Sequence, residues 1–495
     1  MNREATLPFD NSYAQLPERF YARLNPTPVS APGLIRVNHE LARHLGIDPD
    51  WLESEAGVEV VAGNRIPDGA EPIATVYAGH QFGSWVPQLG DGRAILLGEI
   101  VGADGVRYDI QLKGAGRTPY SRGGDGRVPL GPVLREYIVS EAMAALGIAT
   151  TRTLAAVITG DHVMRDSSEP SGVLARVAQS HIRIGTFEFF AARQDYDALR
   201  LLVDHVIQRH YPEAAQADKP CRAMLDRVVA RQAELIASWQ LAGFIHGVMN
   251  TDNMLLSGET IDYGPCAFMD DFHPNTVFSS IDHSGRYAYQ NQPGIAHWNL
   301  RGLAQILMPL LDENEDKALE SAQEAIDAFP DLFADAHRQG MSRKLGLAER
   351  KTDDETLIQD LLTLMIQEKA DFTLTFRRLT DLACPESQAV RDVGEVHEIP
   401  DAFAPWMHRW RERIATDSLD TFERKRSMQS VNPAYIPRNH LVEEVIDAAV
   451  GQQDFEPFHK LVDVLARPYE YDAERVHYAT PPRPDQVVSQ TFCGT

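Results

Sequence analysis

A crowded polar stretch in the middle of the chain constrains its fold more than any other feature. HGVMNTDNMLL runs from His246 to Leu256, and IDYGPC follows shortly after it. The preceding run MLDRVVARQAELIASWQLAGF has the apolar spacing of a long helix that ends at Gly243. The polar residues should therefore form a loop between this helix and a short strand, MLL. A loop anchored on both sides in this way can hold several oxygen ligands in fixed positions.

Two of these oxygen donors suit a divalent cation. Asn253 and Asp262 carry the hard ligands that Mg²⁺ and Mn²⁺ prefer, and both ions commonly bridge phosphate groups. Gly264 of the DYG motif is expected to give the backbone the freedom that turns the carboxylate inward. A single loop Asp more often serves only to make a turn. The combination behind a long helix favours a metal site.

The spacing resembles the catalytic loop of protein kinases, H-R-D-x-x-x-x-N, which a D-F-G motif follows. His246 and Asn253 keep the kinase separation, and DYG takes the place of DFG. The position of the kinase catalytic Asp, however, holds Val248, whereas Asp252 stands next to Asn253. The base of an ordinary kinase is therefore missing, and Asp252 is the candidate replacement.

The segment upstream has a different character. AILLGEI and VRYDIQLKG read as two strands joined by a GADG hairpin, and VLREYIVSEAMAALGI reads as an amphipathic helix. TLAAVIT and GVLARVA resume the strand pattern, whereas the chain after about residue 199 is mostly helical. These patterns predict an α+β fold in which a small β-rich lobe precedes a larger helical lobe. The resemblance to kinases implies that this fold is bilobal and protein-kinase-like. The expected parts are an N-terminal extension (1–70), a β-rich N-lobe (71–190), a helical C-lobe (191–390) and a C-terminal helical extension with a Cys-bearing tail (391–495).

The β-rich segment also carries candidate phosphate-binding residues. Lys113 ends a strand and Glu136 lies in the following helix, as the Lys–Glu pair of kinases does, although a surface ion pair would look the same in sequence. Two glycine-rich runs, LGDGRAILLGE and GAGRTPYSRGGDGRVPLG, bracket Lys113 and can form anion nests. Neither run fits a Walker-type loop. Arg176 and Arg183 add two cations, which by themselves read as sheet-edge charges.

The charge balance limits the partners. A formal net charge of −24, from 47 basic and 71 acidic side chains, disfavours broad binding to nucleic acid or to anionic membranes. One basic island lies between Arg93 and Arg135, and it suits either a small anion or a solvated face. No apolar run approaches the ~18 residues that a membrane span requires. The start MNREATLPFDNS lacks a signal-like apolar region, so a cytoplasmic protein is expected.

Taken together, the motifs resemble the selenoprotein O family of pseudokinase-like protein adenylyltransferases. The resemblance runs from about Tyr77, in YAGHQFGSWVPQLGDGR, through Tyr289, and the tail TFCGT resembles the Cys- or selenocysteine-bearing end of that family. It implies that ATP binds in reverse relative to kinases, with its terminal phosphates where a kinase places adenine. AMP would then be transferred to a Ser, Thr or Tyr hydroxyl of a protein, with modification of the chain itself and use of UTP left open.

The resemblance also implies roles for individual residues. Asp252 would be the base that accepts the hydroxyl proton, and Asn253 and Asp262 would hold Mg²⁺ or Mn²⁺. The residues implied to bind the nucleotide are Gly90, Gly92, Arg93, Lys113, Asp125, Gly126, Arg176, Arg183 and Asp262. Two alternatives remain open, a kinase that uses Asp252 as its base and a nucleotide-binding scaffold without activity.

The four cysteines match no zinc pattern and are too few for a disulfide scaffold. Cys266 follows Asp262 by four residues, and Cys493 lies in the tail. The family's Cys-bearing tail suggests a reversible Cys266–Cys493 disulfide that gates activity. A reduced, structural cysteine is the competing interpretation.

Overall fold

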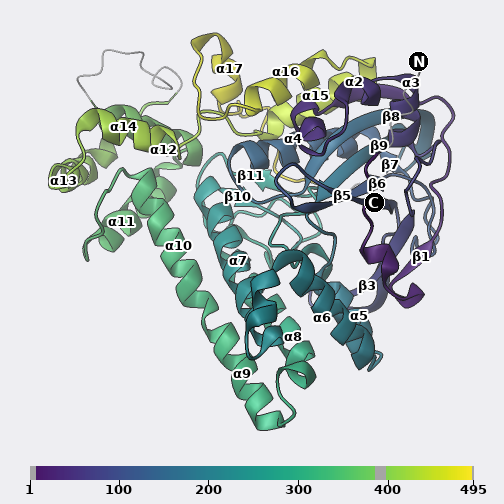
Figure 1. The fold of residues 1–495 in the computed structure, drawn as a ribbon. Helices are drawn as coiled ribbons and strands as arrows, with labels where there is room; N and C mark the ends of the chain where they lie inside the picture. The colour runs from purple at the N-terminus through teal and green to yellow at the C-terminus, as the bar shows by residue number, and fades with distance from the viewer. Residues whose placement is uncertain (1–6, 385–396, 493–495) are drawn as a thin grey trace.

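A large antiparallel sheet organises the N-terminal part of the molecule. In the computed structural model, which describes residues 7–384 and 397–492, nine strands follow the order β1-β3-β5-β6-β9-β8-β2, with β4 paired to β3 and β7 paired to β9 (Figure 1). The strands are β1 (Tyr21–Arg23), β2 (Gly33–Val37), β3 (Ile73–Gln81), β4 (Ser84–Gly90), β5 (Ala94–Val101), β6 (Arg107–Lys113), β7 (Val128–Pro129), β8 (Arg152–Met164) and β9 (Ser168–Ala178). The sheet expected from the sequence is confirmed, as is the β5–β6 hairpin.

The side chains of β6 alternate between the two faces of the sheet. Ile110 and Leu112 are buried in a core that also contains residues of α1 (His39–His44), α2 (Pro49–Leu52) and α3 (Glu55–Ala62). Because successive residues of a strand point to opposite faces, Gln111 and Lys113 point to the other face. That face is covered by α4 (Leu130–Ala145), the helix predicted from VLREYIVSEAMAALGI. A lysine at the end of β6 is thus aimed at α4.

The rest of the chain is largely helical, as predicted. Figure 1 shows the long helices α7, α8, α9 and α10 extending away from the sheet, with α13 and α14 beyond α12. The helix bounds are α5 (Ile184–Ala191), α6 (Tyr196–His210), α7 (Pro220–Ala242), α8 (Gln292–Leu311), α9 (Glu315–Asp327), α10 (Phe329–Lys344), α11 (Asp354–Glu368), α12 (Phe372–Leu382), α13 (Ala404–Ile414), α14 (Thr421–Gln429), α15 (Asn439–Gln452), α16 (Glu456–Leu465) and α17 (Val476–Ala479).

The helix before the polar stretch ends where the sequence predicted. Gly243 follows α7 with a φ of 70°, the left-handed conformation in which glycine commonly ends helices. A two-stranded ribbon, β10 (Phe244–Ile245) with β11 (Ala267–Phe268), then closes the base of the loop. The strand expected at MLL is wrong, since Leu255 makes only an isolated bridge with Arg183. This bridge connects the loop to Arg183, which follows the sheet in the chain.

Both chain extensions join the structure around the sheet. β1 pairs with β3 and β2 pairs with β8, so residues within 1–70 supply strands on both sides of the sheet order. At the other end, α15 and α16 pack on α4, with which they share a buried core (Figure 1). The four-part division and the kinase-like arrangement of lobes stay predictions. In the described residues, no helix combines the length and apolar character needed to cross a membrane.

Candidate active site

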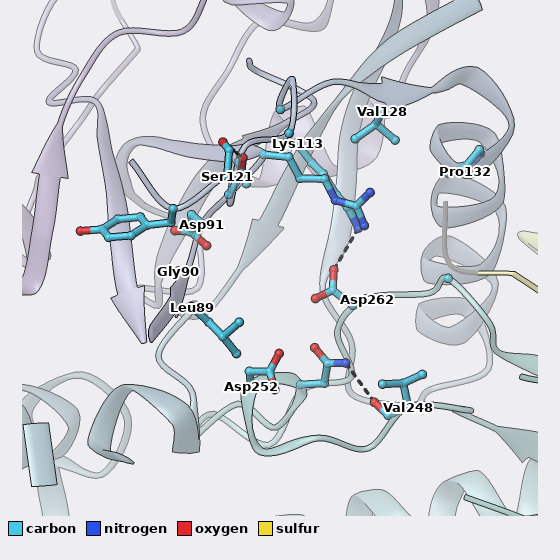
Figure 2. A pocket seen from close by; sticks show the side chains of 18 of the residues that line it. Leu89, Gly90, Asp91, Lys113, Ser121, Val128, Pro132, Val248, Asp252 and Asp262 are labelled. Atoms are coloured by element: carbon cyan, nitrogen blue, oxygen red, sulfur yellow. Dashed lines mark hydrogen bonds and ion pairs between the residues drawn. The ribbon is translucent and has the colours of Figure 1, made fainter. Parts of the chain in front are cut away.

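A cavity of about 430 Å³ lies where the sheet meets the loop 246–265. Figure 2 shows Ser121 and Val128 of the glycine-rich segment on one side of it and Val248 and Asp252 on the opposite side. Every residue that the sequence predicted for the nucleotide, the metal or catalysis lines this cavity. These residues are Gly90, Gly92, Arg93, Lys113, Asp125, Gly126, Glu136, Arg176, Arg183, Asp252, Asn253 and Asp262. Segments far apart in the chain therefore meet at one place.

Lys113 lies at the centre of a buried cluster of charges. Its Nζ donates to Glu136 of α4 and, at 2.9 Å, to Oδ1 of Asp262. Arg176 of β9 contacts the same two acids, with Nη1 2.7 Å from Oδ1 of Asp262 and 3.2 Å from Oε1 of Glu136. Lys113, Glu136 and Arg176 are all buried. The Lys113–Glu136 pair is therefore no surface pair, and loss of one partner should cost roughly 3–5 kcal/mol of stability.

Asp262 reaches this cluster through an uncommon backbone conformation. Its φ is 63°, in the left-handed region that Asp tolerates better than most residues. The expectation that Gly264 makes this turn is wrong, because Gly264 is not among the residues with positive φ. Burial opposes ionisation of Asp262, but Lys113 and Arg176 hold the pKa of its carboxyl well below the ordinary value. The ionised carboxylate uses Oδ1 for both cations, and its other oxygen points into the cavity (Figure 2).

Asp252 stands on the opposite side, in a short 3-10 turn over Thr251–Asn253. It is 8% exposed, and burial raises the pKa of its carboxyl to about 6. Gln81 of β3 donates to Oδ2 at 3.2 Å, whereas Oδ1 has no hydrogen-bond partner in the described part of the chain. A buried carboxylate oxygen without a donor is costly, and such groups concentrate at functional sites. Asp252 is thus poised to accept a proton or a ligand donor.

The position of Asp252 depends on a glycine in β3. A Cβ at Gly79 would lie 2.5 Å from Oδ1 of Asp252 and 3.1 Å from Cδ1 of Leu89. The carboxylate therefore packs directly against the backbone of the strand, and Gln81 holds it from the same strand. Sequence reasoning missed both Gly79 and Gln81. The only signal was their place in YAGHQFG, the stretch in which the family resemblance begins.

Asn253 is oriented so that its oxygen can serve a cation. Its side-chain Nδ2 donates to the backbone oxygen of Val248 at 2.9 Å. This bond uses the nitrogen and not Oδ1 of the amide. Together with the second oxygen of Asp262, this donor set fits Mg²⁺, which typically takes one or two protein ligands and completes its shell with water and phosphate oxygens. In the described residues no group of three His, Cys, Asp or Glu could bind a metal by itself.

His246 and Val248 shape the loop rather than the chemistry. His246 is fully buried, its Nε2 bonds the oxygen of Ile261 at 2.8 Å, and its ring stacks on Trp239. This contact fixes the loop next to Asp262. Val248 lines the cavity with an apolar side chain where a kinase would carry its catalytic Asp. The separation of His246 and Asn253 is therefore structural, and Asp252 is the carboxylate that the loop presents.

The glycine-rich runs lie close against each other. Gly90 has a φ of 144°, and a Cβ there would lie 2.5 Å from the ring of Tyr120. Gly126 has a φ of 71°, and a Cβ there would lie 2.0 Å from the oxygen of Gly116. A side chain at Gly90 would push the two runs apart, and one at Gly126 would force open the second run, to which Gly116 also belongs. Glycine at these two positions therefore allows the runs to pack together as one wall of the cavity.

Several cations line the same wall. The guanidinium of Arg127 donates to the backbone oxygens of Gly114, Thr27 and Pro28, which position the group without neutralising its charge. Asp125, by contrast, accepts two hydrogen bonds from Arg165 at 2.9 and 3.1 Å. Arg165, which sequence reasoning missed, lines the cavity together with Arg122. The wall suits a multiply charged anion.

Arg176 and Arg183 are not sheet-edge charges. Arg176 lies in β9, between β6 and β8, and each guanidinium is buried. Arg183 lies over the ring of Tyr77, 4.2 Å from its centre, and 3.7 Å from Oδ1 of Asp91. Burial opposes its charge, but Tyr77 and Asp91 raise the pKa of Arg183. Both arginines therefore remain charged inside the molecule, where they face the cavity.

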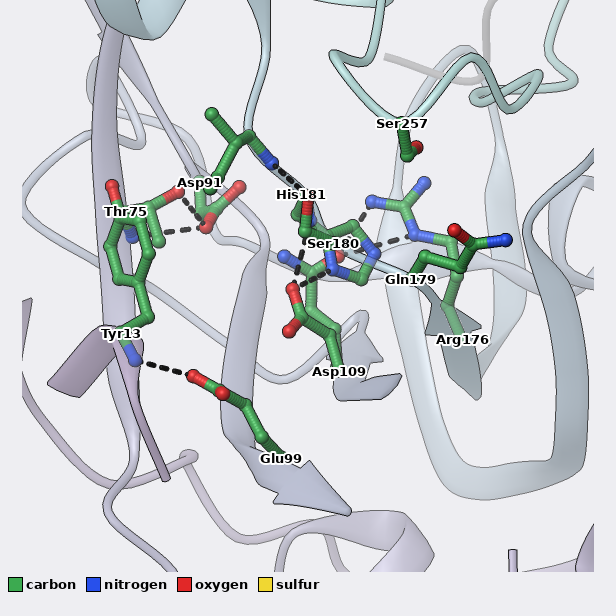
Figure 3. A network of polar contacts seen from close by, with 12 residues as sticks. Tyr13, Thr75, Asp91, Glu99, Asp109, Arg176, Gln179, Ser180, His181 and Ser257 are labelled. Atoms are coloured by element: carbon green, nitrogen blue, oxygen red, sulfur yellow. Dashed lines mark hydrogen bonds and ion pairs between the residues drawn. The ribbon is translucent and has the colours of Figure 1, made fainter. Parts of the chain in front are cut away.

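A buried polar network supports the sheet behind the cavity (Figure 3). Asp109 accepts from the backbone N–H of His181 at 2.8 Å and from its Nδ1 at 2.9 Å, and Arg209 bridges Asp109 to Glu99. Glu99 in turn accepts from the backbone N–H of Tyr13 at 2.6 Å. The network ties the N-terminal segment to β5 and β6. It thereby stabilises β6, the strand that ends at Lys113.

The basic island divides between two roles. Arg93, Arg122 and Arg127 line the cavity, but Arg135 of α4 binds the backbone oxygens of Gly264 and Cys266 at 3.0 and 2.6 Å. The island is therefore neither only an anion site nor only a solvated face. Cys266, four residues after Asp262, is fully buried. Cys493 lies outside the described residues, so the Cys266–Cys493 disulfide stays a prediction.

Residues 3–466 match the family model described as "Protein adenylyltransferase SelO". The chain belongs to the SelO family. It is similar to "Protein nucleotidyltransferase YdiU" of Rhodopseudomonas palustris (strain BisB5) and of Bradyrhizobium diazoefficiens, with 60% identity over 488 residues in each case and 99% of both chains covered. SelO-family membership, which the sequence motifs predicted, is confirmed, and it supports nucleotidyltransferase activity.

Proposed function

We propose that this SelO-family chain is a metal-dependent protein adenylyltransferase that transfers AMP from ATP to a Ser, Thr or Tyr hydroxyl of a protein. Family membership supports the reaction class. The cavity supports the details, because it combines a carboxylate with an unbonded oxygen, a donor set that fits Mg²⁺ and a wall of arginines.

The observation that carries the proposal is the position of Asp252. It lines the cavity where Val248 leaves no kinase base, and it lies opposite the glycine-rich segment (Figure 2). If the outer phosphates bind at Arg122 and Arg127, the α-phosphate is the one left near Asp252 and Asp262. This orientation of ATP is reversed relative to kinases. It gives the arginines of this wall the role of binding the outer phosphates, whereas the kinase interpretation gives them no role.

In the proposed reaction, Asp252 accepts the proton of the acceptor hydroxyl through Oδ1. The hydroxyl oxygen forms a bond to the α-phosphorus, the bond from that phosphorus to the bridging oxygen breaks, and pyrophosphate leaves with the electron pair. Asn253 and Asp262 would hold Mg²⁺ or Mn²⁺, which when bound stabilises charge on the phosphate oxygens. A base in this position contributes about 10²–10⁴-fold to the rate.

Isotope-labelled ATP tests this proposal. Incubation with Mg²⁺ and a protein acceptor should transfer label from [α-³²P]ATP and none from [γ-³²P]ATP, and Asp252→Ala should lower transfer by at least about 10²-fold. Label from the γ position alone would instead establish a kinase that uses Asp252. If neither nucleotide labels protein although ATP binds, the chain is a scaffold. A parallel reaction with [α-³²P]UTP compares the two donors.

A further inference from the structure

An exposed row of aromatic rings lies beside the cavity. The His80 ring lies 5.0 Å from the ring of Trp85, across the β3–β4 hairpin, and 5.5 Å from that of Trp298 on α8. Trp85 and Trp298 are 40% and 41% exposed, which is unusual for tryptophan side chains. Arg286 extends the row, with its guanidinium 5.1 Å from the centre of the Trp298 ring. Exposed aromatic clusters of this kind commonly mark binding surfaces.

The row is fixed to the catalytic loop. At the tip of the hairpin, the backbone N–H of Phe82 donates to Oδ1 of Asn250 at 2.9 Å, and the hydroxyl of Tyr287 donates to the same oxygen at 2.7 Å. The Phe82 side chain lines the cavity and its ring contacts Tyr287. Ile281, which is 50% exposed, lines the cavity as well. The aromatic row therefore continues into the cavity mouth.

The charge of this surface is opposite to that of the whole chain. α8 contains no Asp or Glu, and Arg301 is exposed one turn after Trp298, on the same side of the helix. The Nε of Arg286 has no hydrogen-bond partner among the described residues. Among the described residues, two buried acids contact the row: Glu188 pairs with His80, and Asp282 accepts from the backbone N–H of Arg286 at 2.9 Å. In a chain with a net charge of −24, this surface thus offers aromatic rings flanked by cations.

We infer that Trp85, His80, Trp298 and Arg286 dock an acidic, aromatic-containing segment of the protein substrate beside its acceptor hydroxyl. This inference rests on the proposed function, because it names what the second substrate presents to the same cavity. Tryptophan and arginine are the residues that dominate protein-binding surfaces. The segment would place its aromatic side chain against the rings of Trp85, His80 and Trp298. Its acid would pair with Arg286, while its hydroxyl reaches Asp252 past Phe82.

Peptide binding tests the inference without requiring catalysis. Three fluorescein-labelled peptides with a central Ser differ only in their flanks, which are Glu and Phe, Lys and Phe, or Glu and Ala. Anisotropy titrations with the full chain should show the Glu/Phe peptide binding about tenfold more tightly than either of the others. Arg286→Glu should reverse the preference between Glu and Lys. Trp298→Ala should remove the preference for Phe over Ala.

Matched substitutions control for general effects of charge and ring loss. Arg467→Glu removes an exposed cation, and Phe422→Ala removes an exposed ring from α14; both should leave the preferences unchanged. Equal binding of all three peptides, or an unchanged preference in Arg286→Glu, would overturn the inference. So would a single-stranded oligonucleotide that binds more tightly than the Glu/Phe peptide and is lost in Arg286→Glu. Failure of α-label transfer with the binding preferences intact would refute only the proposed reaction.

Discussion

Replacing Gly79 by alanine should slow the reaction by displacing the carboxylate of Asp252. The new Cβ would lie 2.5 Å from Oδ1 of Asp252, whereas ordinary contacts begin at 3.4 Å, so the oxygen must move by about 0.9 Å. The backbone of Gly79 is not in the left-handed region, so alanine adds no strain of its own. A misplacement of about 1 Å at a reacting group can cost about 10²-fold in rate. We therefore expect kcat to fall about 10²-fold.

Rates of α-label transfer at saturating ATP, together with ATP affinity from calorimetry, check this expectation. Affinity should stay within about twofold of the parent's, because the displaced group is proposed to act on the hydroxyl and not to bind phosphate. Gly33→Ala, in β2 of the same sheet, is the control; its Cβ would meet only the Ile158 side chain, at 3.1 Å. A folded Gly79→Ala chain with the parent's kcat would refute the assignment of Asp252 as the base.

Three further predictions concern the metal, the charge cluster and stability. Asn253→Ala should raise the Mg²⁺ concentration for half-maximal activity at least about tenfold, and EDTA should abolish transfer by the parent. Glu136→Gln should lower the unfolding free energy by roughly 3 kcal/mol, measured with urea, because Lys113 and Arg176 lose a buried partner. Burial lowers the pKa of Lys344 from its ordinary value of 10.5 to about 7. Between these two pH values Lys344 is protonated in the unfolded chain but not in the folded one. The free energy of unfolding should therefore rise with pH across this window, by up to ~1.4 kcal/mol per pH unit. Lys344→Met should flatten this rise; a parent-like slope in the variant would contradict it.

Local patterns predicted the elements and the polar loop. The β5–β6 hairpin, α4 and the end of α7 at Gly243 follow from periodicity and turn chemistry within short windows. The error at MLL has the same origin, since three apolar residues cannot distinguish a strand from a single anchoring bridge. The turn at Asp262 was assigned to the wrong residue because propensity favours glycine, whereas here Lys113 and Arg176 stabilise the aspartate in the left-handed conformation.

What the sequence could not predict depends on contacts between distant segments. Gly79 and Gln81 of β3 lie directly against Asp252 although they are far from it in the chain, and no spacing rule links β3 to the loop 246–265. Arg176 looked like an edge charge because its strand's place in the sheet order was not known. The ion pair between Arg165 and Asp125 likewise could not be predicted, because the fold brings these two residues together.

A crystal structure with a non-hydrolysable ATP analogue and Mn²⁺ tests the central claim most directly, because anomalous scattering locates the metal. The account predicts Mn²⁺ beside Asn253 and Asp262, the α-phosphorus next to it, and the outermost phosphate against Arg122 and Arg127. The purine under the glycine-rich segment, with the γ-phosphorus at Asp262, would contradict it.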